Sequence, residues 1–152
     1  MTDAASPLPL LVLDTNVVLD WLFFADPGCA PLSLAIRHRQ VRWIASQGMR
    51  NEIEHVLQRG IRARRPAGIG SVLASWDEWA SIVPTGDGPL PATLRCTDPD
   101  DQKFIDLALR TGASALLTRD RAVLKLARRA RAHGLSIQTA VAWQERTKVQ
   151  NP

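Results

Sequence analysis

Two aspartates follow short apolar runs of the kind that form buried strands. Asp14 ends the run LPLLVLD, residues 8–14, and Asp120 comes shortly after ASALLT, residues 113–118. A buried ionised carboxylate is costly unless a partner, a proton or a metal compensates it. Ligands of open parallel sheets bind beyond the carboxyl ends of the strands, so both acids are candidates for functional side chains. For Asp120 the alternative is a helix N-cap, a position that Asp favours.

A third acid, Asp101, would lie on the buried side of a helix predicted over residues 99–111. Three apolar residues follow it at +3, +4 and +7: Phe104, Ile105 and Ala108. The helix dipole favours an acid in the first turn, and Asp98 before Pro99 has the pattern of an N-cap followed by a first helical residue. The dipole does not explain why Asp101 should face the apolar side.

A fourth acid, Glu52, stands at the edge of the buried side of a helix predicted over residues 47–59. That buried side has four apolar members: Met49, Ile53, Val56 and Leu57. Glu52 and Val56 are neighbours at i, i+4, so Glu52 can reach inward past the helix. Glu54 points elsewhere, and we expect it to be an ordinary solvated charge.

The four carboxylates of Asp14, Glu52, Asp101 and Asp120 come from separate segments and are predicted to converge at one end of the sheet. Without a counter-charge they would repel one another and raise each other's pKa values. A hard divalent cation, Mg²⁺ or Mn²⁺, prefers such oxygen ligands and resolves the conflict. Zinc is disfavoured, because the sequence has no ligand-like pair of histidines and no nearby cysteine motif.

The chemistry expected of such a centre is hydrolysis of a phosphodiester. The formal charge of +4 should attract polyanions, of which nucleic acid is the commonest. A carboxylate-held metal lowers the pKa of a bound water and stabilises charge on phosphate oxygens. Asn16 and Thr118 are predicted polar neighbours that position water or phosphate, although Asn16 is equally explained as a plain helix cap.

The elements that must position these acids alternate between strands and helices. Strands are predicted over 8–14, 41–46, 113–118 and 136–140, and residues 71–83 are predicted to form a helix and a short strand. Further helices are predicted over 16–26, 31–39, 47–59, 98–112 and 119–134, with a short helix after the last strand. The alternation predicts an α/β three-layer sandwich with a central, mostly parallel sheet flanked by helices. The length of 152 residues and a hydrophobic content of 45% predict one domain, residues 1–152, with its core at about 9–140.

The two cysteines, Cys29 and Cys96, are too few for a disulfide framework and indicate a reduced, cytoplasmic location. The first residues do not resemble a secretion signal. Apolar runs do not reach the roughly 18 charge-free residues of a membrane span. We therefore expect no membrane association.

Four fragments occur in the order LVLDTNVVLD, NEIEHVL, DPDDQKFIDLAL and LLTRD. Together they resemble the PIN-domain family over residues from about 9 to 140, and the DPDD form resembles its bacterial toxin-like branch. The resemblance implies a five-stranded parallel sheet and a Mg²⁺- or Mn²⁺-dependent ribonuclease, commonly the toxin of a toxin–antitoxin pair. The implied partners are an RNA substrate and a small antitoxin protein, and we also expect a homodimer or a higher oligomer.

The resemblance also assigns roles to individual residues. It implies that the metal-binding acids are Asp14, Glu52, Asp101 and Asp120, and it supports Asn16 and Thr118 as their neighbours. In the family's motif the third acid precedes an apolar and a small residue on a helix, which selects Asp101 over Asp98 or Asp100.

Two basic clusters are candidates for contact with RNA phosphates. The first contains Arg59, Arg62, Arg64 and Arg65, and the second contains Lys125, Arg128, Arg129 and Arg131. The second is explained as the solvated outer face of a helix, so the first is the predicted RNA contact. Trp76 and Trp79 stand at helical spacing and are predicted to pack in the core rather than to stack on bases.

Two alternatives compete with the nuclease hypothesis. One is a non-catalytic nucleic-acid-binding or interaction module, which would bind in a salt-dependent way without turnover. The other is a haloacid dehalogenase-type phosphatase, which also begins with an apolar strand ending in an aspartate. Those phosphatases need a second acid two residues later, where this chain has Asn16.

Overall fold

Five short parallel strands form the central sheet, in the order β3-β2-β1-β4-β5. The structure is a computed structural model that describes residues 7–61 and 66–143. The strands are β1 (Leu10–Leu13), β2 (Arg42–Ala45), β3 (Ala80–Ile82), β4 (Ala115–Leu117) and β5 (Ser136–Gln138). Leu11, Leu13, Leu116 and Leu117 are all buried, as expected for strands covered on both faces. The predicted α/β fold with a five-stranded parallel sheet is confirmed.

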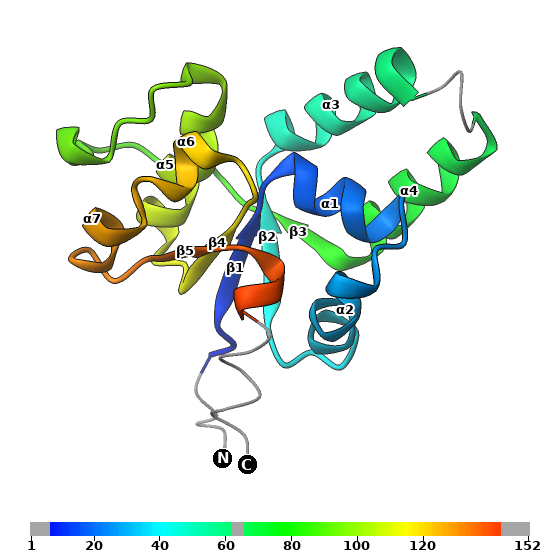
Figure 1. The fold of residues 1–152 in the computed structure, drawn as a ribbon, viewed down its shortest axis with the longest axis horizontal. Helices are drawn as coiled ribbons and strands as arrows, with labels where there is room; N and C mark the ends of the chain where they lie inside the picture. Colours follow the sequence, from blue (N-terminus) through cyan, green and yellow to red (C-terminus); the bar gives the residue numbers. More distant parts are fainter. Residues whose placement is uncertain (1–6, 62–65, 144–152) are drawn as a thin grey trace.

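Helices cover both faces of the sheet (Figure 1). On one side lie α1 (Thr15–Leu22), α2 (Ala30–Arg37), α3 (Gln47–Val56) and α4 (Pro66–Trp79), and on the other lie α5 (Gln102–Thr111), α6 (Arg121–Leu124) and α7 (Ala127–Arg131). The chain builds β2 and β3 on one flank of β1 and then β4 and β5 on the other. The direction of winding therefore reverses between β1 and β4, which is where ligands of open α/β sheets bind.

The helices are short, and the longest, α4, spans 14 residues. No single helix among the described residues is long and apolar enough to cross a membrane. Thr15–Leu22 and Pro27–Arg37 meet the length and composition requirement only as a pair, and a bend of 107° separates them.

Trp43 on β2 is the centre of the core beneath α1 and α4. Its ring packs edge-on against Trp21 at 5.5 Å and against Trp76 at 5.3 Å between ring centroids. Trp76 is 2% exposed, and Trp79 is partly buried against the same core. The prediction that these two tryptophans of α4 pack inward is confirmed.

Two predicted helices are broken in the structure, and both breaks lie next to the acids of interest. The helix predicted over 98–112 begins with a 3-10 helix, η4 (Pro99–Asp101), and only then becomes α5. Asp98 caps this turn by accepting a hydrogen bond from the Asp100 N–H at 3.0 Å. The helix predicted over 119–134 divides into α6 and α7. The periodic apolar pattern continues through both breaks, so it did not reveal them.

Candidate metal centre

Asp14 is held at the point where β1 and β4 end side by side. Its backbone N–H donates to the Leu117 carbonyl at 2.9 Å, which continues the pairing of the two strands. Its side chain is part of a residue only 4% exposed, and Oδ2 accepts a hydrogen bond from Thr118 Oγ1 at 2.8 Å. The carboxylate is therefore fixed in place at the reversal of the sheet.

Thr118 connects Asp14 to Asp120. It is fully buried, and its Oγ1 accepts a hydrogen bond from the Asp120 N–H at 3.0 Å while donating to Asp14. Asp120 in turn accepts from the Ala122 N–H through Oδ1 at 2.8 Å, so its predicted role as the N-cap of α6 is confirmed. One side chain thus orders the two acids that end neighbouring strands.

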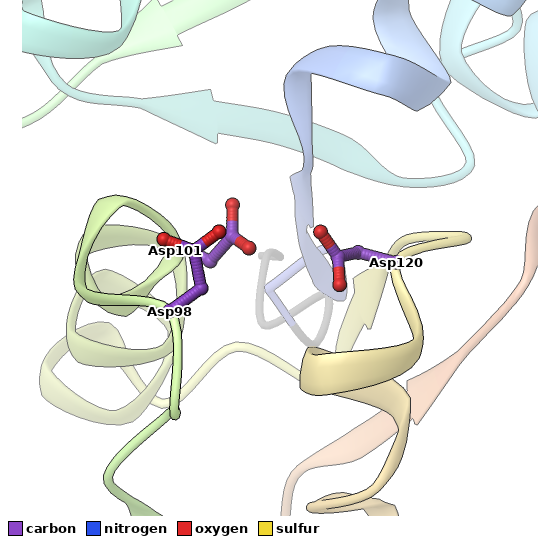
Figure 2. A group of neighbouring side chains, drawn as sticks. All are labelled: Asp98, Asp101 and Asp120. Atoms are coloured by element: carbon purple, nitrogen blue, oxygen red, sulfur yellow. The ribbon is translucent and has the colours of Figure 1, made fainter.

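Three aspartates form a cluster in front of this edge. One carboxylate oxygen from each of Asp98, Asp101 and Asp120 lies within 4.8 Å of the others. Asp98 and Asp101 come from the turn before α5, and Asp120 faces them from the turn before α6 (Figure 2). Oδ2 of Asp101 is buried and accepts no hydrogen bond. We call these three residues the aspartate cluster; it could hold a metal ion.

The electrostatics of Asp101 show the cost of assembling these charges without a cation. Burial first, then a side-chain hydrogen bond with the Asp120 carboxyl, and then the charges of Asp14, Asp120 and Asp98 raise the pKa of Asp101 to about 7. Burial also raises the pKa of Asp14 against the opposing effect of its hydrogen bond from Thr118, and the charge of Asp120 adds to the rise. The site favours protons or another positive charge.

The donor set fits a hard cation. All three members of the cluster offer carboxylate oxygens, the ligands that Mg²⁺, Mn²⁺ and Ca²⁺ prefer. Cys96 is a soft donor two residues before Asp98, and burial followed by the charges of Asp101, Asp120 and Asp98 raises the pKa of its thiol. A thiol that resists ionisation is a poor metal ligand.

Glu52 is not a member of the aspartate cluster. Its Oε1 accepts a hydrogen bond from Thr15 Oγ1 at 2.7 Å, and its Oε2 forms an ion pair with Lys103 Nζ. Lys103 also donates to the Asp100 carbonyl at 2.9 Å. Glu52 therefore links the first residue of α1 to the beginning of α5, and its charge is compensated by a lysine.

Asn16 occupies the second position of α1, because Asp14 is the N-cap and Thr15 the first helical residue. The alternative that Asn16 is a plain helix cap is wrong. Its Oδ1 accepts a hydrogen bond from the Arg119 N–H at 3.4 Å. The Arg119 guanidinium pairs with Asp20 at 2.8 Å, so Asn16 and Asp20 both attach α1 to the loop that carries Asp120.

Of the four arginines predicted to contact RNA, the structure describes Arg59. Arg59 is exposed in the π-helical turn η2 (Leu57–Ile61), which follows α3. Arg62, Arg64 and Arg65 lie outside the described residues.

Asp98 is the residue that sequence reasoning missed as a potential ligand. The sequence interpretation gave it only a capping role, which it does perform through Oδ1. A signal was available, since Asp98 and Asp101 are three residues apart and such side chains lie on the same face of a helical turn. The Asp98 side chain therefore caps the turn and also belongs to the aspartate cluster.

A family model described as PIN domain matches residues 10–122 of this chain. Among solved structures, the chain is similar to one in the crystal structure of VapBC2 from Rickettsia felis bound to a DNA fragment from their promoter, with a TM-score of 0.59. The two are 13% identical, and the similarity covers 86% of this chain and 98% of that one, so it concerns the fold. No curated protein gives a significant sequence match.

Proposed function

Because the chain belongs to the PIN-domain family, we propose that it is a Mg²⁺- or Mn²⁺-dependent ribonuclease that hydrolyses RNA phosphodiester bonds. The observation that supports this most is the aspartate cluster at the reversal of the sheet, with a buried Asp101 oxygen that lacks a hydrogen-bond donor. An uncompensated group of this kind is rarely retained without a ligand. Because the chain belongs to the PIN-domain family, we no longer propose a haloacid dehalogenase-type phosphatase.

In this proposal Asp98, Asp101 and Asp120 would hold the cation, with Asp14 beside them. A bound Mg²⁺ or Mn²⁺ would supply a water of lowered pKa and stabilise charge on phosphoryl oxygens. Asp101, whose pKa of about 7 favours a proton, would have to lose that proton to act as a ligand. Asp14, fixed by Thr118, offers a carboxylate oxygen that does not need to reorganise as substrate arrives.

Glu52 and Lys103 have a supporting part. Their ion pair, together with the hydrogen bond from Thr15, connects the start of α1 to the start of α5. The Lys103 side chain is 36% exposed, so we propose that it can also contact an incoming phosphate. Glu52 is thus proposed as a positioning residue, whereas the sequence interpretation made it a ligand.

The decisive experiment compares RNA cleavage by the purified protein in Mn²⁺ and in EDTA, and repeats it with Asp14→Asn and Asp101→Asn. We expect EDTA and each substitution to remove cleavage. Asp100→Asn is the matched control, because Asp100 is an exposed acid adjacent to the cluster and loses the same charge. Cleavage that survives EDTA and both site substitutions would refute the proposal, and salt-dependent binding without turnover would favour the non-catalytic alternative.

We further propose that the chain is the toxin of a toxin–antitoxin pair, acting in the cytoplasm. Support comes from the DPDD motif of the toxin-like branch and from the likeness in fold to a chain of the VapBC2 complex. The test is to express the chain alone and with the small protein encoded next to it. Growth arrest by the chain alone, relieved by coexpression and absent with Asp101→Asn, is the expected result; unimpaired growth in all three cases contradicts it.

A further inference from the structure

We propose that a basic groove beside the aspartate cluster binds the sugar–phosphate backbone of the RNA strand and leads it to the cluster. The inference rests on the proposed ribonuclease function and extends it to the residues that hold substrate. The groove has a volume of about 700 Å³. Four cationic residues line it: Arg95, Lys125, Arg128 and Arg129.

The walls of the groove continue into both sides of the aspartate cluster. One wall contains Arg95 and Thr97, and the chain passes from Thr97 directly to Asp98. The other contains Ala122 of α6, whose N–H donates to Asp120. Cys96, between the two residues of the first wall, lies within the electrostatic influence of all three aspartates. A strand lying in the groove would therefore reach the cluster without leaving the surface.

The cations of the groove are not neutralised by other described residues. Arg95, Lys125, Arg128 and Arg129 are exposed, and none forms an ion pair within the described residues. Elsewhere in the same chain Arg50 is paired with Asp77 and Arg119 with Asp20. Among the described residues, those that line the groove include no acidic side chain. Mutual repulsion among these cations is relieved by a polyanion.

The break between α6 and α7 lies among three of these cations, Lys125, Arg128 and Arg129. Leu126 follows Lys125 at this break and is buried at 5% exposure, and Ala130 anchors α7 with no exposure. Arg128 and Arg129 then extend from the outer side of α7 into the groove, where Arg95 approaches from the loop before η4.

The chemistry favours a polynucleotide over an acidic protein segment. The groove leads to the aspartate cluster, where the proposed hydrolysis needs a phosphodiester beside the cation, and an acidic peptide side chain offers no bond for that reaction. The described part of the chain places no aromatic side chain in the groove lining for base stacking. The groove should therefore recognise the sugar–phosphate backbone of RNA and not its base sequence, and binding should depend strongly on salt concentration. This location differs from the arginines of residues 59–65 that the sequence interpretation favoured.

The test measures binding of a labelled single-stranded RNA oligonucleotide by fluorescence anisotropy in EDTA, over a range of salt concentrations. We expect Arg128→Gln/Arg129→Gln to weaken binding about 10-fold at 0.1 M salt. The slope of log K against log salt should become less steep by about 1.4, since each lost contact to a single strand removes about 0.7. Arg95→Gln/Lys125→Gln should behave alike and covers the case in which the first variant fails to fold.

The matched control is Arg37→Gln/Arg39→Gln, which removes the same charge at the end of α2 on the other side of the sheet (Figure 1). We expect this control to bind within 2-fold of the parent. Unchanged affinity and slope in both groove variants, or an equal loss in the control, would overturn the inference. So would groove-dependent binding of polyglutamate as tight as that of RNA, because it would identify an acidic protein as the ligand.

Failure of the groove and failure of the ribonuclease proposal give different results. Asp101→Asn should abolish cleavage in Mn²⁺ and retain RNA binding in EDTA, whereas the groove variants should lose binding and raise KM with little change in kcat. Groove-dependent binding without any cleavage by the parent protein supports the groove and refutes the ribonuclease. Cleavage by the parent protein with an unchanged KM in the groove variants supports the ribonuclease and refutes the groove.

Discussion

Replacing Asp101 with asparagine should stabilise the metal-free protein and abolish its response to metal. The pKa of Asp101 in the folded state, about 7, is raised above its ordinary value of 3.8. Between these two values the unfolded chain binds fewer protons than the folded one, so stability falls as the pH rises from about 4 to 7. Below about pH 4 both states are protonated and the penalty is absent. Above pH 7 the penalty is complete.

The size of the effect follows from the shift and from the exposure of the group. A shift of about 3 units would correspond to about 4 kcal/mol if the carboxyl were fully buried. Asp101 is only partly buried, so solvent screening reduces this, and we expect about 1–2 kcal/mol. For a chain of this length that is a rise in Tm of about 2–8 °C at pH 8.

The assay is thermal unfolding of the parent protein and Asp101→Asn in EDTA at pH 4 and pH 8, repeated with Mn²⁺ at pH 8. In EDTA the variant should melt higher at pH 8 and alike at pH 4. With Mn²⁺ at about 100 times its Kd the parent should gain about 2.7 kcal/mol and overtake the variant. The exposed Asp100→Asn should show neither effect. A variant that is less stable at pH 8 in EDTA, or that gains as much from Mn²⁺ as the parent, would refute the reasoning.

Three further substitutions separate the roles of neighbouring groups. Thr118→Val should lower the free energy of unfolding, measured by chemical denaturation, by about 1–3 kcal/mol, and it should also lower cleavage. The substitution leaves the buried Asp14 carboxylate and the Asp120 N–H without their hydrogen-bond partner. An unchanged free energy of unfolding would contradict a stabilising role for these two hydrogen bonds. Glu52→Gln weakens the ion pair with Lys103 but leaves the cluster intact, so calorimetry should find Mn²⁺ affinity changed far less than by Asp101→Asn; an equal loss would restore Glu52 as a ligand. Asp98→Asn preserves an N-cap and should leave Tm in EDTA nearly unchanged while lowering Mn²⁺ affinity; unchanged affinity would limit Asp98 to capping.

The fold could be predicted because its strands carry strong local signals. Buried parallel strands appear as short continuous apolar runs, and residues 8–14 and 113–118 contain β1 and β4. The breaks in the helices could not be predicted in the same way. The turn η4 results from a local contact between Asp98 and the Asp100 N–H, and the division of α6 from α7 leaves the apolar spacing intact. Periodicity reports which side is buried, not whether the backbone is continuous.

The role of a site residue could be predicted only where it follows from the side of the helix that the residue faces. Asp101 was selected because an acid on an apolar stripe needs a reason, and its buried oxygen without a donor is consistent with that argument. Glu52 does reach inward, but the sequence could not show that Thr15 and Lys103 meet it there, because both contacts join segments far apart in the chain. Arg95 was missed because it comes from a loop, where no period predicts orientation.

Asp98 and Asp120 show why capping and ligand roles should not be treated as alternatives. Each caps a helical turn through Oδ1, and each also contributes a carboxylate oxygen to the cluster. The backbone N–H groups at the two turn starts, those of Asp100 and Ala122, provide partial positive charge beside the two carboxylates. This local compensation leaves Asp101, which has no side-chain cap bond and an unpartnered buried oxygen, with the largest uncompensated demand for positive charge in the cluster. The two capped acids can therefore be maintained by the fold alone, whereas Asp101 needs either a proton or a cation, and we propose that Mg²⁺ or Mn²⁺ replaces the proton.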